Sequence, residues 1–166
     1  SCGSYPELIA VDPSSGDIYA VTTLPPPGKV RRLLGTSFRE AAVGVAGLGA
    51  TAVALDAAHP SGSPVLYVVN AQDDTVTCLS ATSLQTVATV AVGSRPRGIA
   101  VDEVRHTVYV TNWNAQTVSV FDGATFRRTG GVATGRGPHG IGLDTAGRLL
   151  YVTNTWENTM STFRIE

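Results

Sequence analysis

The chain has 166 residues, of which 43% are hydrophobic and 15% are charged, and its formal net charge is -1. This length fits one domain, and the apolar content is sufficient for a buried core and too high for a disordered tail. No run of Lys or Arg is present, which argues against nucleic-acid binding and against a polybasic membrane patch. No apolar run reaches the ~20 residues of a transmembrane helix, so no transmembrane segment is expected.

The start of the chain carries the first of two cysteines. Ser1 to Ser4 contain neither the charged start nor the apolar centre of a secretory signal. Three states remain open for Cys2: a free thiol, a disulfide with Cys78, or the acylated cysteine of a trimmed lipoprotein. Cys78 lies in an alternating run, and we expect it to be a small buried apolar residue. No cysteine or histidine spacing suits zinc and no cofactor motif is present, so we expect neither metal nor cofactor.

Four similar units follow one another, at approximately residues 5–49, 50–93, 94–135 and 136–166. The last three share a tyrosine that recurs every 42 residues, within alternating apolar residues and turn signals. A repeat of this length is typical of a propeller blade. We therefore expect an all-β chain, a single β-propeller domain over residues 1–166 with about four blades of four-stranded antiparallel meanders. The tyrosine motifs are Ile18-Tyr19-Ala20-Val21-Thr22, Leu66-Tyr67-Val68-Val69-Asn70, Val108-Tyr109-Val110-Thr111-Asn112 and Leu150-Tyr151-Val152-Thr153-Asn154.

The fourth unit stops after its third predicted strand, at residues 159–165. Such a strand leaves an open edge that can pair with another chain, so a homo-oligomer through residues 159–165 is one expectation. Three arrangements are compatible with this pattern: a tight four-bladed ring, two chains that complete one eight-bladed ring, and a fragment of a longer propeller. We favour the last two. No stretch has sustained helical periodicity, and the best helix candidate, Ser37 to Val45, is short and uncapped.

Two sets of polar residues recur in register. An aspartate closes the first strand of every unit, and an asparagine closes the second strand of the last three units. Four aligned carboxylates suggest a metal site, but each one precedes a turn whose backbone amides it can cap, and we favour capping. We expect the asparagines to accept hydrogen bonds from amides of their own hairpin loops. The residues are Asp12, Asp56, Asp102, Asp144, Asn70, Asn112 and Asn154.

The candidate site consists of the positions at which the units differ. The candidate residues are in register just before each first strand, which is one mouth of the axial channel in a propeller: Glu7, Thr51, Arg97 and His139. Together they suit a small anionic or sugar-like ligand, with Arg97 as a bidentate clamp, His139 as a titratable acid or base and Glu7 as its partner. The plainer interpretation is that they are solvated turn residues.

Two tryptophans extend this candidate site. Trp113 and Trp156 lie on corresponding hairpins beside asparagines, where an exposed indole can stack on a sugar or pack on a partner. The alternative is that each tryptophan covers its hairpin or the junction with the next blade. The remaining histidines, His59 and His106, lie in turns, and we expect both at the surface.

The motifs Tyr-Val-Thr-Asn (151–154), Thr-Val-Ser-Val-Phe-Asp (117–122) and Pro-Arg-Gly-Ile-Ala-Val-Asp (96–102) resemble the YVTN family of β-propeller repeats. The resemblance is strong over residues 96–166, fair over 51–93 and weak over 5–49, where Thr22-Thr23 replaces Thr-Asn. It implies the propeller fold and a secreted or cell-envelope, extracytoplasmic setting. Family propellers usually have about seven blades, and the family hosts lactone hydrolases, oxidoreductases and proteins without known chemistry.

Three functions are compatible with these observations, and the least favoured is a half-propeller that serves only in self-association. The first is a non-enzymatic binding scaffold that presents a rigid surface or channel mouth, because no complete catalytic set of residues is visible in one place. The alternative is a lactonase-like hydrolase or lyase, with His139 and Glu7 as candidate catalytic residues and Arg97 as the clamp. We favour the non-enzymatic scaffold.

Overall fold

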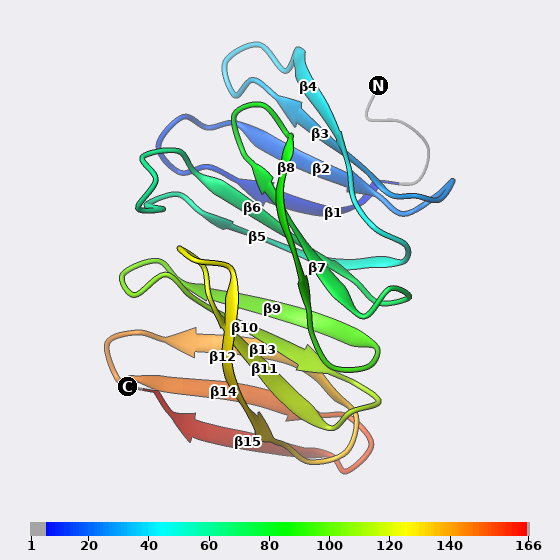
Figure 1. The fold of residues 1–166 in the computed structure, drawn as a ribbon, viewed down its shortest axis with the longest axis vertical. Helices are drawn as coiled ribbons and strands as arrows, with labels where there is room; N and C mark the ends of the chain where they lie inside the picture. The colour runs from blue at the N-terminus through cyan, green and yellow to red at the C-terminus, as the bar shows by residue number, and fades with distance from the viewer. Residues whose placement is uncertain (1–5, 166) are drawn as a thin grey trace.

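The computed structural model describes residues 6–165, and every regular element in that range is a β-strand (Figure 1). The strands form four separate antiparallel sheets, each a meander in chain order. We name these sheets blades 1 to 4. Blade 1 holds β1 (Pro6–Val11), β2 (Ile18–Thr22), β3 (Lys29–Leu33) and β4 (Glu40–Val45). Blade 2 holds β5 (Ala50–Asp56), β6 (Val65–Asn70), β7 (Thr75–Ser80) and β8 (Thr86–Ala91). Blade 3 holds β9 (Pro96–Asp102), β10 (Thr107–Asn112), β11 (Thr117–Asp122) and β12 (Arg127–Ala133). Blade 4 holds β13 (Pro138–Asp144), β14 (Leu149–Asn154) and β15 (Thr159–Arg164).

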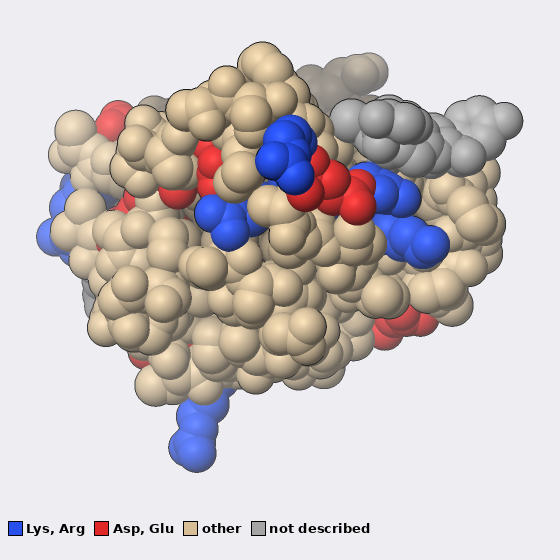
Figure 2. Space-filling view, turned by 90° about the horizontal axis from the view of Figure 1, so that it is seen from above, with Lys and Arg blue, Asp and Glu red and all other residues tan. Residues whose placement is uncertain are grey.

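This arrangement confirms the predicted fold class of blade-like antiparallel meanders. The blades succeed one another along the long axis of the molecule, with blade 1 at one end and blade 4 at the other (Figure 1). Their first strands, β1, β5, β9 and β13, contact one another in that order. Among residues 6–165 there is no helix that could span a membrane. Seen from the blade 1 end, the surface is largely uncharged, and most charged groups gather toward one side (Figure 2).

The core consists of the seams between consecutive blades. The second strands are rich in β-branched and aromatic residues, which suits a strand packed on both faces, and all six residues of β6 are buried. Each blade turns its tyrosine toward the following blade, and Tyr19, Tyr67 and Tyr109 are all buried there. We call this the forward face of a blade and the opposite one its rear face. The outer strands β8 and β12 are mostly exposed.

The recurring aspartates cap turns, as predicted. Asp12 accepts a hydrogen bond from the Ser14 amide at 2.8 Å, and its three counterparts accept from amides two or three residues further on. The carboxylates therefore have local structural partners, which confirms the capping interpretation. The counterparts are Asp56, Asp102 and Asp144.

The recurring asparagines link blades, and here the prediction is wrong in its detail. The Asn112 Oδ1 atom accepts from the Gly93 amide at 3.0 Å, and its Nδ2 atom donates to the hydroxyls of Thr117 and Ser119. Asn70 makes the same set of bonds, with Gly47 as the amide donor. The donor belongs to the loop that arrives from the preceding blade and not to the residue's own hairpin. Asn70 and Asn112 therefore each tie their own blade to that loop.

The structure also tests the predictions for Cys78, for residues 37–45 and for His59. Cys78 is fully buried in the seam between blades 2 and 3, as predicted, and Cys2 lies outside the described residues. The helix candidate at residues 37–45 is instead a turn followed by β4. His59 is only 6% exposed, which corrects the expectation of a surface residue. Its Nε2 atom lies 2.9 Å from the Gly123 carbonyl oxygen, and its ring stacks on Phe126 of blade 3.

Candidate functional site: an aromatic and cationic rim

The candidate site lies where the first strands of blades 3 and 4 begin. Arg97 is the second residue of β9, and His139 is the second residue of β13, which lies beside β9. The hairpin after β10 reaches the same end of the molecule, because Asn112 pairs with Pro96. The topology therefore brings two of the predicted residues to one side of the axis.

Trp113 is the centre of this group. Its ring centroid lies 5.6 Å from the Arg97 guanidinium carbon and 5.6 Å from the His139 ring centroid, with the His139 ring nearly perpendicular to it. The Trp156 ring lies 5.0 Å away at an interplanar angle of 78°. On the far side, the Arg136 guanidinium carbon is 6.0 Å from the Trp156 centroid. We call Arg97, Trp113, Arg136, His139 and Trp156 the rim cluster.

The tryptophans meet because they occupy different places on corresponding hairpins. Trp113 follows the recurring asparagine directly, whereas Trp156 follows its own asparagine by two residues. The Trp113 amide donates to the Arg95 carbonyl at 2.9 Å, and the Trp156 amide donates to the Arg136 carbonyl at 3.2 Å. Both hairpins are thus tied to the loops that lead into their own blades. The offset lets the two indoles contact each other across the seam.

Small residues and one hydroxyl fix the backbone below the rings. Thr111 donates a hydrogen bond to the His139 carbonyl at 2.9 Å and accepts one from the Gly98 amide at 2.8 Å, so it joins β9 to β13. Gly137 has a φ of +66°, and a Cβ atom there would come within about 3.0 Å of the Trp156 ring. Glycine is therefore required by both the backbone conformation and the space under the indole.

The rim cluster contains two arginine guanidinium groups. Within residues 6–165, neither Arg97 nor Arg136 takes part in an ion pair. The Arg97 Nε atom is buried and has no hydrogen-bond partner in that range. A guanidinium held against an indole face and lacking an acceptor suits an anion that approaches in the plane of the guanidinium. Trp156 is 53% exposed, so the aromatic surface is open to solvent.

The other two predicted positions are not part of this cluster. Thr51, at the start of β5, donates its hydroxyl hydrogen to the Pro96 carbonyl at 3.2 Å, which gives it a structural link to blade 3. Glu7 is exposed on β1, and in the described part of the chain it makes neither a hydrogen bond nor an ion pair with Arg97 or His139. Blade 2 stands between blade 1 and blade 3, which separates Glu7 from Arg97.

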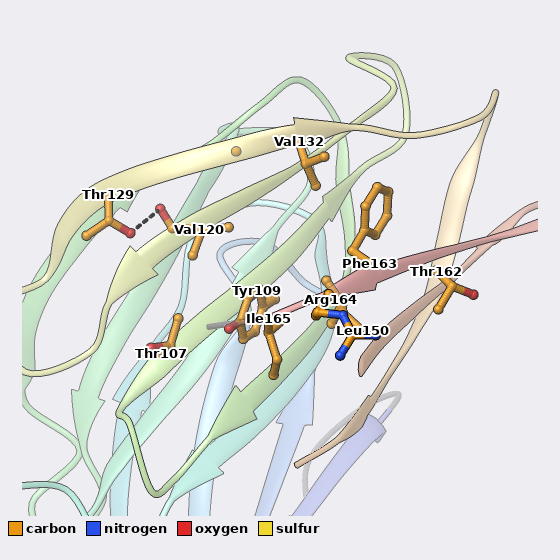
Figure 3. A pocket seen from close by; sticks show the side chains of 11 residues that line it. Thr107, Tyr109, Val120, Thr129, Val132, Leu150, Thr162, Phe163, Arg164 and Ile165 are labelled. Atoms are coloured by element: carbon orange, nitrogen blue, oxygen red, sulfur yellow. Dashed lines mark hydrogen bonds between the residues drawn. The ribbon is translucent and has the colours of Figure 1, made fainter. Parts of the chain in front are cut away.

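A cavity of about 600 Å³ lies elsewhere, in the seam between blades 3 and 4 (Figure 3). In the two preceding seams, a large side chain from the outer turn of the following blade packs into the core: Leu84 in the first seam and Phe126 in the second. Within residues 6–165, no corresponding side chain packs into the third seam. The lining includes Tyr109, Val120, Val132, Leu150, Phe163 and Ile165.

Sequence reasoning found part of this arrangement. It selected Arg97, His139, Trp113 and Trp156, which the structure brings together, but it did not select Arg136 or the cavity. Arg136 stands in a glycine-rich loop, and only its relation to the Trp156 hairpin would have drawn attention to it.

No family model matches the sequence, and no curated protein matches it. Solved structures are similar in fold. A hydrazine synthase from Kuenenia stuttgartiensis aligns at a TM-score of 0.77 and 20% identity, over 89% of this chain and 41% of that one. A functionally unknown protein from Desulfotomaculum acetoxidans aligns at 0.77 and 16%, over 98% and 56%. The computationally designed Ika8 protein aligns at 0.73 and 11%, over 95% and 45%. The chain thus spans roughly half the length of these structures, and the likeness shows the fold alone.

Proposed function

We propose that this chain is a non-enzymatic β-propeller scaffold that binds an anionic sugar at the rim cluster. The observation that carries the proposal is the contact of Trp113 with Arg97, His139 and Trp156 in one group. The indole faces offer flat apolar surfaces for a pyranose ring, and the guanidinium groups, which form no ion pair with any residue from 6 to 165, offer donors to a carboxylate. A sugar acid has both features, so it fits the cluster better than a neutral sugar or a purely apolar ligand.

The geometry supports binding over acid–base catalysis. A catalytic histidine needs a group that orients its ring and fixes its tautomer. The His139 ring packs on Trp113, and its nitrogens have no hydrogen-bond partner among residues 6–165. Glu7, the predicted partner of His139, makes no bond to it in that range. The five side chains present a surface to which a ligand can adhere, without the relay that a hydrolase or lyase requires.

The YVTN relationship and the extracytoplasmic setting that it implies belong to the same proposal. The tyrosine motifs occupy equivalent second strands in all four blades, as expected for repeats of this kind. The scaffold also has a means of self-association, because β15 ends blade 4 with a free sheet edge in the described range. The proposed function therefore includes binding of a second copy of the chain at the blade 4 end.

Calorimetric titration with trigalacturonate tests the sugar proposal, with the matching neutral galactose oligosaccharide as the comparison ligand. Arg97→Gln removes the cation that faces Trp113, and loss of a charge-assisted hydrogen bond of about 1.5–3 kcal/mol weakens binding by roughly 10-fold to 100-fold. Trp113→Ala removes the central contact surface and weakens binding by at least about 10-fold. Arg127→Gln removes an exposed arginine on β12, far from the rim, and leaves the affinity unchanged.

Two results would count against the proposal. The first is equal affinity for the charged and the neutral oligosaccharide, which would mean that the guanidinium groups play no part. The second is an equal loss of affinity in the Arg97 and Arg127 variants, which would point to general charge screening in place of a site at the rim.

A further inference from the structure

We propose that two copies of this chain pack end to end, with the forward face of blade 4 in each copy against the rear face of blade 1 in the other. The inference keeps the self-association of the proposed function but assigns it to packing between blade faces in place of pairing along the β15 edge, and it is independent of the rim cluster. It rests on a comparison of the two end blades with the three seams inside the chain. At the same positions, residues that are buried or partly buried inside the chain are exposed at its ends.

The rear face of blade 1 carries an apolar pair on its first strand. Ile9 and Val11 are 65% and 53% exposed. Each of the other first strands has apolar residues at the same two positions, and there they pack against the cluster formed with the preceding blade. Blade 1 therefore has the contact surface of an internal blade but no partner for it in the described chain. The equivalent pairs are Val53 and Leu55, Ile99 and Val101, and Ile141 and Leu143.

The outer turn of blade 1 carries a third exposed residue. Phe38 is 68% exposed, with a φ of +54°. Leu84 and Phe126 stand at the same position in blades 2 and 3, with φ values of +57° in both cases. Leu84 is 2% exposed in the seam with blade 1, and Phe126 packs against the seam with blade 2. A large apolar side chain at this turn thus serves to cover the preceding blade.

The forward face of blade 4 is the complementary half. Met160 lies on β15 opposite Thr153 and is 60% exposed. Its counterparts on the third strands of the other blades, Val30, Val76 and Val118, are fully buried. Tyr151 is only partly buried, in contrast to the tyrosines of blades 1 to 3. Both residues occupy the positions that a following blade covers elsewhere in the chain.

A second copy fits both ends at once. The two exposed halves are the two sides of a seam that the chain forms three times internally, so a blade of the same sequence type is their natural partner. Ile9, Val11 and Phe38 are apolar side chains, so their own burial in such a contact carries no cost of desolvating a charge. Two contacts of one kind close a cyclic pair.

Light scattering and sedimentation of the purified chain give the first test. The inference predicts a species of twice 17.2 kDa, which dissociates only on dilution. A strictly monomeric protein at all concentrations would overturn it. Masses that continue to rise with concentration would also overturn it, because they would show open chains of copies in place of a closed pair.

Two variants then test the end-to-end geometry. The first carries Ile9→Asp and Phe38→Asp on blade 1, and the second carries Met160→Asp on blade 4. Each variant alone is monomeric, because both contacts in its pair include one altered face. Mixed together, they form a pair through the single seam whose two faces are both unaltered. If the blade 1 variant alone remains dimeric, the copies join through blade 4 faces or β15 edges and the inference is wrong.

The remaining outcomes are equally decisive. A dimeric Met160→Asp protein would mean that two blade 1 faces meet, which also contradicts the inference. Val104→Asp is the matched control, because Val104 is 78% exposed in a turn of blade 3, away from both ends, and its replacement leaves the mass unchanged. The end variants retain trigalacturonate binding, whereas Arg97→Gln retains the dimer mass. Failure of this inference is therefore distinguishable from failure of the rim proposal.

Discussion

Replacement of Asn112 by Ala is expected to destabilise the protein by about 2–4 kcal/mol. The Asn112 side chain is fully buried and makes three hydrogen bonds, to the Gly93 amide and to the hydroxyls of Thr117 and Ser119. Each such bond contributes about 1 kcal/mol net, and a buried group left without a partner costs more. The Gly93 amide keeps a second acceptor, the Ser119 hydroxyl at 3.2 Å, which limits the loss.

Asn154 offers a matched comparison in blade 4. Its Nδ2 atom makes the equivalent two bonds, to Thr159 and Ser161, but its Oδ1 atom has no partner among the described residues. Replacement of Asn154 by Ala removes one hydrogen bond fewer and also eliminates the buried oxygen that had no partner. The expected loss of unfolding free energy is therefore only about 1–2 kcal/mol. Urea denaturation at a single protein concentration measures both values. If Asn154→Ala costs as much as Asn112→Ala, the account of the asparagine as a link between blades is refuted.

Three further predictions follow from the packing. Leu84→Ala opens a cavity in the first seam and lowers the free energy of unfolding, measured by urea denaturation, by about 2–5 kcal/mol. Phe38→Ala, at the same position of blade 1, changes the stability of the dilute monomer by less than about 0.5 kcal/mol. Equal losses of stability in the two variants would contradict the seam assignment. Burial raises the pKa of the Cys78 thiol to about 12, so a thiol reagent is expected to leave Cys78 unmodified up to pH 9 unless urea unfolds the chain. Peptide mapping separates Cys78 from Cys2, and rapid labelling of Cys78 in the native protein would contradict this. Gly137→Ala forces a strained backbone conformation and displaces the Trp156 ring, so the tryptophan fluorescence emission maximum is expected to shift. An unchanged emission spectrum and an unchanged stability would show that the Trp156 ring does not pack on Gly137.

The repeat made the architecture predictable. A spacing of 42 residues, turn residues at fixed places and β-branched second strands all agree with one blade type, and local preferences of this kind are the part of a fold that sequence encodes most directly. The asparagine links were less accessible. The partner of Asn112 is an amide 19 residues earlier in the chain, and a hydrogen bond from the loop of the preceding blade leaves no local pattern.

His59 was predicted wrongly for the same kind of reason. Its surroundings in sequence are Pro, Ser and Gly, which indicate a solvated loop. The imidazole is buried because Phe126 and Gly123, more than sixty residues later in the chain, come from the next blade to cover it. Contacts across a seam depend on how far successive blades rotate, and this rotation cannot be obtained from the composition of a loop.

The candidate site shows the same division. Alignment of the repeats predicted that Arg97 and His139 stand at equivalent places in their blades. The contact between β9 and β13 makes the two residues neighbours. The same alignment gave Glu7 the equivalent place in blade 1, but blade 2 stands between Glu7 and Arg97. Equivalent positions in the repeat therefore need not be in contact. Arg136 became visible as a site residue only when the Trp156 ring was located beside it.

Trp113 and Trp156 are the only two tryptophans in the chain, so each indole N–H gives its own signal in a nitrogen–proton correlation spectrum. Titration with trigalacturonate, followed through these two signals, tests the central claim most directly. The account predicts that both indole signals move together and saturate at one affinity, with little change under the neutral oligosaccharide. Two indole signals that stay in place while amide signals elsewhere shift would contradict it.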